Sequence, residues 1–90
     1  MNKVFKALDD PTRRKILDLL RVQDLNAGDI GSHFEMAGAT MSHHLKILLD
    51  AELVSCDKAG QQRVYSLNTT VFQSVLEWIY SLKGENYEKK

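Results

Sequence analysis

Apolar residues recur at helical spacing along most of this chain. Side chains that repeat every three to four positions form one buried face of an α-helix. Five stretches show this spacing, and it predicts five helices joined by short polar segments. The predicted helices are Lys3–Leu8, Pro11 to about Arg21, Ala27–Phe34, the stretch from Ala37-Gly38 to Asp50, and Thr69 to about Lys83.

Capping residues mark where most of these helices begin. Asp10-Pro11 is the strongest start signal, because an Asp side chain accepts hydrogen bonds from unpaired amides and Pro suits the first helical position. Asn2, Asn26 and Asn68 are predicted to cap the first, third and last helices. The fourth helix has only Ala37-Gly38 where a polar cap is favoured, which costs roughly 1 kcal/mol.

Between the fourth and last helices the apolar spacing becomes alternating. Residues 53–57 and 63–67 are predicted to be two short strands, and the polar, glycine-containing segment Lys58–Gln62 between them suits a β-hairpin. The resulting order is α-α-α-α-β-β-α, which is the winged helix-turn-helix arrangement. We therefore predict a mainly α fold with a two-stranded β-wing in one domain, residues 1–83, followed by a polar C-terminal tail, residues 84–90.

Composition fits a single soluble domain. The chain has 90 residues, of which 43% are hydrophobic and 27% charged, and this leaves no room for a second domain. No apolar run approaches the roughly 18 residues of a membrane span, and the N-terminal sequence MNKVFKALDD has acids where a signal peptide would be apolar. We therefore expect a cytoplasmic protein without membrane insertion. The lone Cys56 agrees with a reducing compartment.

Charge is balanced over the chain but unevenly placed. Lys and Arg number 12, as do Asp and Glu, although nucleic-acid-binding domains are often basic. No acid occurs from Met36 to Leu49 or from Lys58 to Leu76. These segments contain the second helix of the predicted helix-turn-helix and the wing, which are the elements that meet DNA in such folds. The pattern fits DNA binding, although chance spacing would also explain it.

The helix-turn-helix is predicted to span Asp29 to Asp50. In such a motif the first helix crosses the phosphate backbone, and the N-terminal residues of the second reach base edges in the major groove. His44 points about 100° away from His43, and a contact between helices or with phosphate is its better explanation. The groove-facing candidates are Ala39, Thr40, Ser42 and His43, and Lys46 is the basic side chain of this helix.

Two blocks of sequence resemble the ArsR/SmtB family of bacterial repressors, and in particular its small metal-independent members. The blocks are Ala7–Leu20 (ALDDPTRRKILDLL) and Met41–Leu48 (MSHHLKIL), with Gly60-Gln61 and Val64–Asn68 as further matches in the wing. The resemblance covers nearly the whole chain. It implies a homodimer that binds double-stranded DNA at a palindromic operator and represses transcription.

The resemblance also implies which residues contact DNA. The groove-facing positions of the family fall on the four candidates named above. Family members often carry Ser or Gln where this chain has Ala37–Ala39, so base reading is expected to depend more on Thr40, Ser42, His43, the wing and DNA shape. The wing of the family falls on Lys58–Arg63, and the wing candidates are Lys58, Gln61, Gln62 and Arg63.

The first and last helices carry more apolar surface than one small core can hide. A core-facing stripe needs roughly 100° of a helix, and the apolar residues of the last helix cover more than that. A homodimer through these two helices would bury the excess. The candidate dimer residues are Val4, Phe5, Leu8, Val71, Phe72, Val75, Leu76, Trp78, Ile79 and Leu82.

Metal sensing, which is common among ArsR-type proteins, requires several converging Cys, His or carboxylate ligands. The segment Ala27–Phe34 has no Cys pair, and the last helix holds no His, Cys or Asp and a single acid, Glu77. We therefore expect no metal and no cofactor. Release by a protein antirepressor or dose-dependent autoregulation is more credible than release by a small inducer.

Other functions fit these residues less well. Enzymatic activity is not expected, because Ser42 and His43 are adjacent on a helix and their side chains diverge. Two alternatives stay open: a winged-helix module that binds another protein through the surface around Trp78, and an ArsR-type metal sensor with an atypical site. Arg13 and Arg14 are expected either to form ion pairs toward the wing or to lie on a solvated face.

Overall fold

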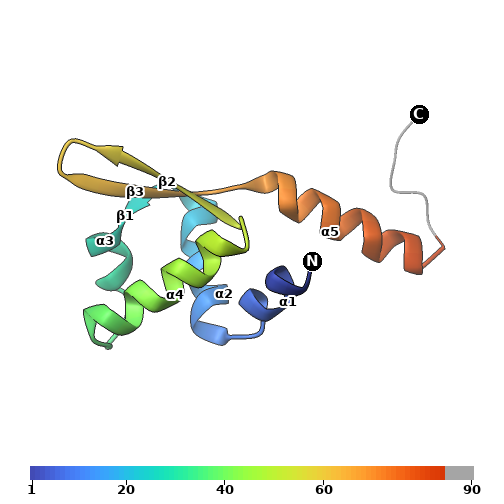
Figure 1. The fold of residues 1–90 in the computed structure, drawn as a ribbon, viewed down its shortest axis with the longest axis horizontal. Coiled ribbons are helices and arrows are strands. Elements are labelled where there is room, and N and C mark those ends of the chain that lie inside the picture. The colour runs from blue at the N-terminus through green and yellow to red at the C-terminus, as the bar shows by residue number, and fades with distance from the viewer. Residues whose placement is uncertain (85–90) are drawn as a thin grey trace.

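The computed structural model of this protein describes residues 1–84, and the winged helix-turn-helix order is confirmed within them (Figure 1). Helices α1–α4 gather below the sheet, whereas α5 extends away from them at the end of the molecule opposite the β2–β3 hairpin (Figure 1). Most of the polar tail predicted at 84–90 lies outside the described residues. The helices are α1 (Asn2–Leu8), α2 (Pro11–Val22), α3 (Ala27–Gly31), α4 (Gly38–Asp50) and α5 (Thr69–Leu82), and the strands are β1 (Leu25–Asn26), β2 (Val54–Ala59) and β3 (Gln62–Leu67).

The sheet has three strands in the order β1-β3-β2. Strands β2 and β3 form the predicted two-stranded wing, and β1 is a third strand that was not predicted. Strand β1 pairs antiparallel with β3, with Leu25 opposite Tyr65 and Asn26 opposite Val64. Strands β2 and β3 pair continuously out to Ala59, so the hairpin loop is shorter than the predicted Lys58–Gln62 segment. A glycine suits this tight turn, because Gly60 has φ +64° in the left-handed region.

Three of the predicted helix caps are confirmed. Asp10 Oδ1 accepts a hydrogen bond from the Arg13 amide at 3.1 Å, and Asn26 Oδ1 accepts one from the Asp29 amide at 2.7 Å. Asn68 Oδ1 accepts one from the Thr70 amide at 3.4 Å. As predicted, α4 begins without a side-chain cap.

Two predicted helix ends were wrong. Helix α1 includes Asn2, and Met1 occupies its N-cap position without a side-chain hydrogen bond. Helix α3 ends at Gly31 and does not reach Phe34. The chain tightens there, because the Phe34 amide bonds to the Gly31 carbonyl three residues back, at 3.0 Å, instead of continuing the α-helical pattern.

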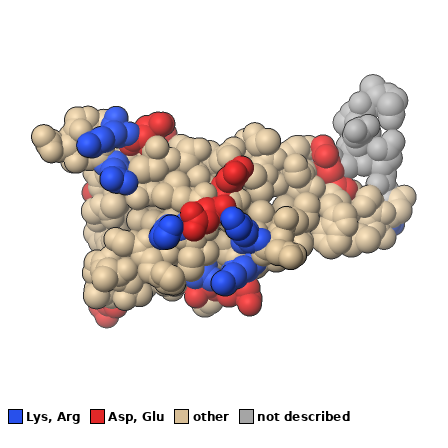
Figure 2. All heavy atoms as spheres, in the orientation of Figure 1, with Lys and Arg blue, Asp and Glu red and all other residues tan. Residues whose placement is uncertain are grey.

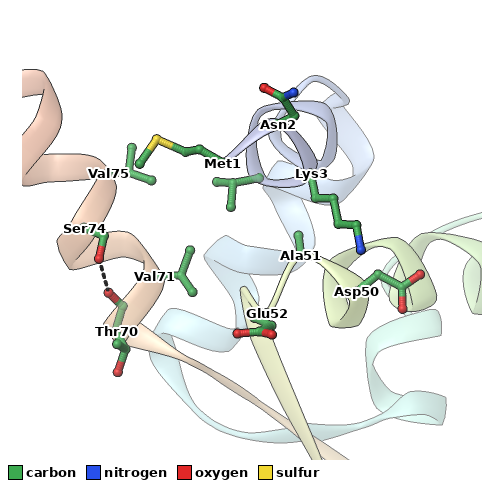
Figure 3. A pocket seen from close by; sticks show the side chains of 11 residues that line it. Met1, Asn2, Lys3, Asp50, Ala51, Glu52, Thr70, Val71, Ser74 and Val75 are labelled. Atoms are coloured by element: carbon green, nitrogen blue, oxygen red, sulfur yellow. Dashed lines mark hydrogen bonds between the residues drawn. The ribbon is translucent and has the colours of Figure 1, made fainter.

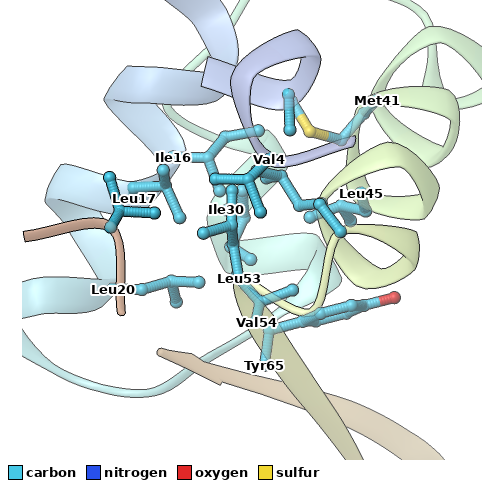
Figure 4. Packing of buried hydrophobic residues seen from close by; sticks show 14 residues of the cluster. Val4, Ile16, Leu17, Leu20, Ile30, Met41, Leu45, Leu53, Val54 and Tyr65 are labelled. Atoms are coloured by element: carbon cyan, nitrogen blue, oxygen red, sulfur yellow. The ribbon is translucent and has the colours of Figure 1, made fainter. Parts of the chain in front are cut away.

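The core joins the two helices of the helix-turn-helix to α2 and the sheet (Figure 4). Its fully buried large side chains are Ile16 of α2, Ile30 of α3, Leu48 of α4 and Leu53 just before β2. Ile30 is therefore fully buried in one cluster with residues of α2, α4 and the start of the wing. This packing holds α3 and α4 at one angle and leaves the opposite face of α4 to solvent.

Arg13 and Arg14 do not pair with the wing. Arg14 is exposed, and its Nη1 donates to the Leu8 carbonyl at 2.6 Å. Arg13 is buried, and its guanidinium donates to the carbonyls of Lys6 and Ala7. Both predicted roles are thus wrong for Arg13, because the short turn between α1 and α2 places the last carbonyls of α1 over the first turn of α2.

Candidate nucleic-acid interface

The N-terminal half of α4 presents the predicted reading residues to solvent. Ala39, Thr40, Ser42 and His43 are all exposed, whereas Met41 on the same helix is buried in the core. The helix also starts with amides that have no side-chain cap. Such amides donate readily to phosphate oxygens, and the helix dipole favours an anion at this end. The exposed face therefore offers side-chain hydrogen-bond donors and acceptors next to an end that suits phosphate.

Lys46, farther along this face, already has an acidic partner. Its Nζ lies 3.5 Å from Asp50 Oδ2, and the two side chains are 75% and 55% exposed. An exposed pair of this kind contributes about 0–1 kcal/mol, so Lys46 can exchange the carboxylate for a phosphate at little cost. Figure 2 shows acidic and basic side chains intermingled over the middle of the face of the molecule that is turned toward the viewer.

The wing places two cations on the same side of the hairpin. Lys58 on β2 and Arg63 on β3 are directly opposite in the strand register, and both are exposed. Like charges at directly opposed positions destabilise a sheet by roughly 0.2–1 kcal/mol, and an anion between them removes that repulsion. Basic side chains gather near the end of this hairpin in the space-filling view (Figure 2).

Two other wing candidates differ in how firmly they are held. Gln61 lies in the exposed turn. Gln62 accepts a hydrogen bond at Oε1 from Asn26 Nδ2 at 3.1 Å, which links the wing to β1. Gln61 is therefore free to adapt to a ligand, whereas Gln62 must break a bond to do so.

The part of the wing nearest the core, around the Cys56–Tyr65 pair, is uncharged. Tyr65 is buried in β3 and pairs in register with Cys56 of β2. Burial, together with the neighbouring Cys56 thiol, raises the pKa of the Tyr65 phenol above its usual value. The phenol therefore stays protonated at neutral pH, and the charge of the hairpin is confined to its outer part.

His44 makes the contact between helices that the sequence favoured. It is half-buried, and its Nδ1 lies 3.1 Å from Arg13 Nη1. Arg13 was not predicted as the partner of His44. The available signal was its place in the first turn of α2, directly after the Asp10 cap and close to the end of α1.

The candidate dimer residues divide into a buried and an exposed group. Val4 and Val75 are 6% and 8% exposed and belong to the core of the single chain. Leu8, Val71 and Phe72 are half-buried against that core. The exposed group, which we call the α1–α5 apolar face, consists of Phe5, Leu76, Trp78, Ile79 and Leu82.

Residues 10–55 match the sequence profile described as "Bacterial regulatory protein, arsR family". The chain belongs to the ArsR family. It is 53% identical over 88 residues to the transcriptional repressor SdpR of Bacillus subtilis, a match that covers 96% of this chain and 98% of SdpR. It is also 38% identical over 86 residues to an arsenical resistance operon repressor of Staphylococcus aureus, covering 96% of this chain and 83% of that protein.

Solved structures show the same fold. A crystal structure of an ArsR family transcriptional regulator superposes with a TM-score of 0.87 at 28% identity, covering 92% of this chain and 86% of the other. HlyU from Vibrio cholerae superposes with a TM-score of 0.73 at 28% identity, covering 92% and 90%. The family resemblance inferred from the sequence is thus confirmed, and these relatives are transcriptional regulators.

Two further properties of this ArsR protein concern metals and membranes. Within residues 1–84, no three His, Cys, Asp or Glu side chains come together in a group that could hold a metal ion. In the same part of the chain, none of the helices has the length and apolar character needed to cross a bilayer.

Proposed function

We propose that this ArsR-family protein is a transcriptional repressor that binds a two-fold symmetric operator as a homodimer. The observation that supports this most directly is the exposed N-terminal half of α4, where Thr40, Ser42 and His43 face solvent from a rigid helix. The core fixes this helix from behind through Met41 and Leu45. A helix held in this way can enter a major groove without rearranging.

The proposed roles follow from the chemistry of each element. Thr40 and Ser42 hydroxyls and the His43 imidazole both donate and accept hydrogen bonds, which suits the mixed pattern on base edges. Lys58 and Arg63 on the wing meet phosphate or the adjacent minor groove. Because net charge is zero, attraction to DNA is local and depends on these segments rather than on the whole protein.

Repression follows from occupancy of the operator. A dimer that covers a site in or near a promoter competes with the transcription machinery. We propose that the protein acts in the bacterial cytoplasm without a resident metal. We also propose that a protein antirepressor or dose-dependent autoregulation relieves repression.

The test is a binding comparison on two DNA fragments of equal length. One fragment carries the region upstream of the gene for this protein, and the other is unrelated DNA of similar base composition. We expect retention of the upstream fragment at moderate salt, where the unrelated fragment is released. Equal affinity for both fragments at every salt concentration, or no binding to either, would contradict the proposal.

A footprint on the retained fragment then defines the site. Two protected half-sites related by a two-fold axis are expected from a dimer. A single protected half-site would contradict the dimeric part of the proposal while leaving sequence-specific binding in place.

A further inference from the structure

Arg13 is the one charged side chain that is buried within the described residues, at 8% exposure. Its Nε donates to the Ala7 carbonyl at 2.9 Å, and its Nη2 donates to the Lys6 carbonyl at 3.1 Å. Asp10 Oδ2 lies 3.9 Å from its Nη1. The guanidinium therefore closes the C-terminal end of α1, where the last carbonyls and the helix dipole favour a cation.

The remaining bond of this guanidinium reaches α4, which we call the reading helix because it carries the proposed base-reading residues. Arg13 Nη1 lies 3.1 Å from His44 Nδ1 on α4. A guanidinium has donors but no acceptor, so His44 Nδ1 accepts in this bond. Through Arg13 of α2, this contact links the end of α1 to α4 at the residue next to His43.

Helix α1 also connects the α1–α5 apolar face to α4, because it contributes to that face and packs on α4. Phe5 of α1 packs on Trp78 of α5 with ring centroids 5.7 Å apart. Helix α1 packs against both α2 and α4, whereas α5 makes no comparably extensive contact with either α1 or α4 in the described part of the chain. An open hollow of about 620 Å³ lies among the start of α1, the end of α4 and the start of α5 (Figure 3). The position of α4 relative to a dimer partner that binds α1 is therefore set largely by the packing of α1 on α2 and α4.

We infer that the Arg13–His44 contact is a positioning device that fixes the reading helix relative to the dimer-forming helix α1. In a two-fold dimer, the angle between α1 and α4 sets the separation of the two α4 helices. This separation in turn sets the half-site spacing that the protein accepts. The inference rests on the proposed function and adds to it how one operator geometry is selected. His44 acts through the position of α4 and needs no contact with DNA.

Two variants at one position separate the hydrogen bond from the ring. His44→Ala removes the acceptor for Arg13. His44→Asn retains an acceptor, because the amide Oδ1 is attached at the same distance from Cβ as Nδ1 and can receive the same N–H. Urea unfolding of each variant identifies conditions in which parent and variants are all folded, and binding is measured only there.

The readout is affinity for a series of operators whose half-sites are moved together or apart by one base pair. We expect the parent to prefer one spacing. His44→Ala should lose roughly 3- to 30-fold on that spacing and show a flattened preference across the series, with unchanged binding to random DNA. His44→Asn should keep most of the parental affinity and the parental preference. Loss of stability alone would not flatten a spacing preference in folded protein.

Three results would overturn the inference. One is an unchanged spacing preference in His44→Ala. Another is an equal loss in His44→Ala and His44→Asn, which would assign the effect to the ring itself. The third is a nitrogen NMR spectrum of the free parent at neutral pH with His44 protonated at Nδ1. Failure of the parent to distinguish operator from random DNA would instead contradict the proposed function, and the NMR result would still report on the contact.

Discussion

Phe5 and Trp78 come from opposite ends of the chain and pack with their rings tilted by 55° and their centroids 5.7 Å apart. Both side chains nevertheless remain 40% and 44% exposed. Such a pair contributes about 0.5–1.5 kcal/mol beyond the area it buries, yet much of its apolar surface still meets water. It lies within the α1–α5 apolar face, and this unburied surface is what a second copy of the chain would cover.

Substitution of Leu82 by Glu should therefore break the dimer. Leu82 is 67% exposed in the single chain, so the change should leave the protomer folded. Two such side chains leave the interface of a two-fold dimer, and the loss should be about 3 kcal/mol or more of association free energy. Sedimentation at micromolar concentration measures the result.

Val22→Glu is the matched control for this experiment. Val22 is 72% exposed near the end of α2 and lies outside the α1–α5 apolar face, so this variant should sediment as the parent does. A parent protein that is monomeric while its circular dichroism shows a folded chain would refute the predicted dimer.

Asp10 should stabilise the fold except in acid. The hydrogen bond from the Arg13 amide is the main cause that lowers the pKa of this carboxyl, and the nearby Arg13 charge adds to it, against a smaller opposing effect of burial. A lowered pKa in the folded state means that the stabilisation is complete above the unfolded value of about 3.9 and is lost as pH falls through the folded value. Asp10→Ala should cost about 1 kcal/mol at pH 7 and clearly less below about pH 3.

Urea unfolding at both pH values measures this difference. Asp10→Asn is the control, because its amide oxygen still caps α2 but does not titrate in this range. Its stability relative to Asp10→Ala should change little with pH. An Asp10→Ala deficit of equal size at pH 7 and pH 3 would show that the charge of the carboxylate has no part in the cap.

Features that depend on neighbours in sequence were predictable. The caps at Asp10, Asn26 and Asn68 lie within three residues of the amides they accept from, so the local sequence contains both partners. The exposed side of α4 followed equally from helical spacing, because the buried Met41 and Leu45 fix which way the rest of the helix points. Together these signals sufficed for the helix-turn-helix and the candidate reading residues.

Features that depend on distant pairing were not predictable. Strand β1 has two residues, too few to show alternation, and it exists because Leu25 pairs with Tyr65 far along the chain. Arg13 looks like an ordinary surface residue in sequence, and only the fold shows that α1 carbonyls and His44 surround it. Long-range contacts of this kind need the assembled structure.

The wing should contribute affinity rather than sequence preference. Lys58→Ala and Arg63→Ala should each weaken binding to operator and random DNA alike, and each should reduce the salt slope by about one per lost phosphate contact. Neither should destabilise the fold, since each relieves the repulsion between two directly opposed cations.

Binding at several salt concentrations measures the salt slopes of the wing variants. Arg21→Ala, an exposed cation outside α4 and the wing, is the control. A wing variant that loses affinity only on the operator would mean that this side chain reads bases.

The reading helix should show the opposite behaviour. If His43 contacts base edges beside Thr40 and Ser42, His43→Ala should cost roughly 1 to 3 kcal/mol on the operator and leave binding to random DNA nearly intact. The dimer carries the change twice, so the effect per complex doubles. His33→Ala removes another exposed imidazole outside α4 and should keep the parental ratio of operator to random affinity. The half-sites should lie about one helical turn apart, or a multiple of it, because both reading helices must enter the same face of the DNA. A His43→Ala protein that distinguishes operator from random DNA as well as the parent does would take His43 out of the reading role.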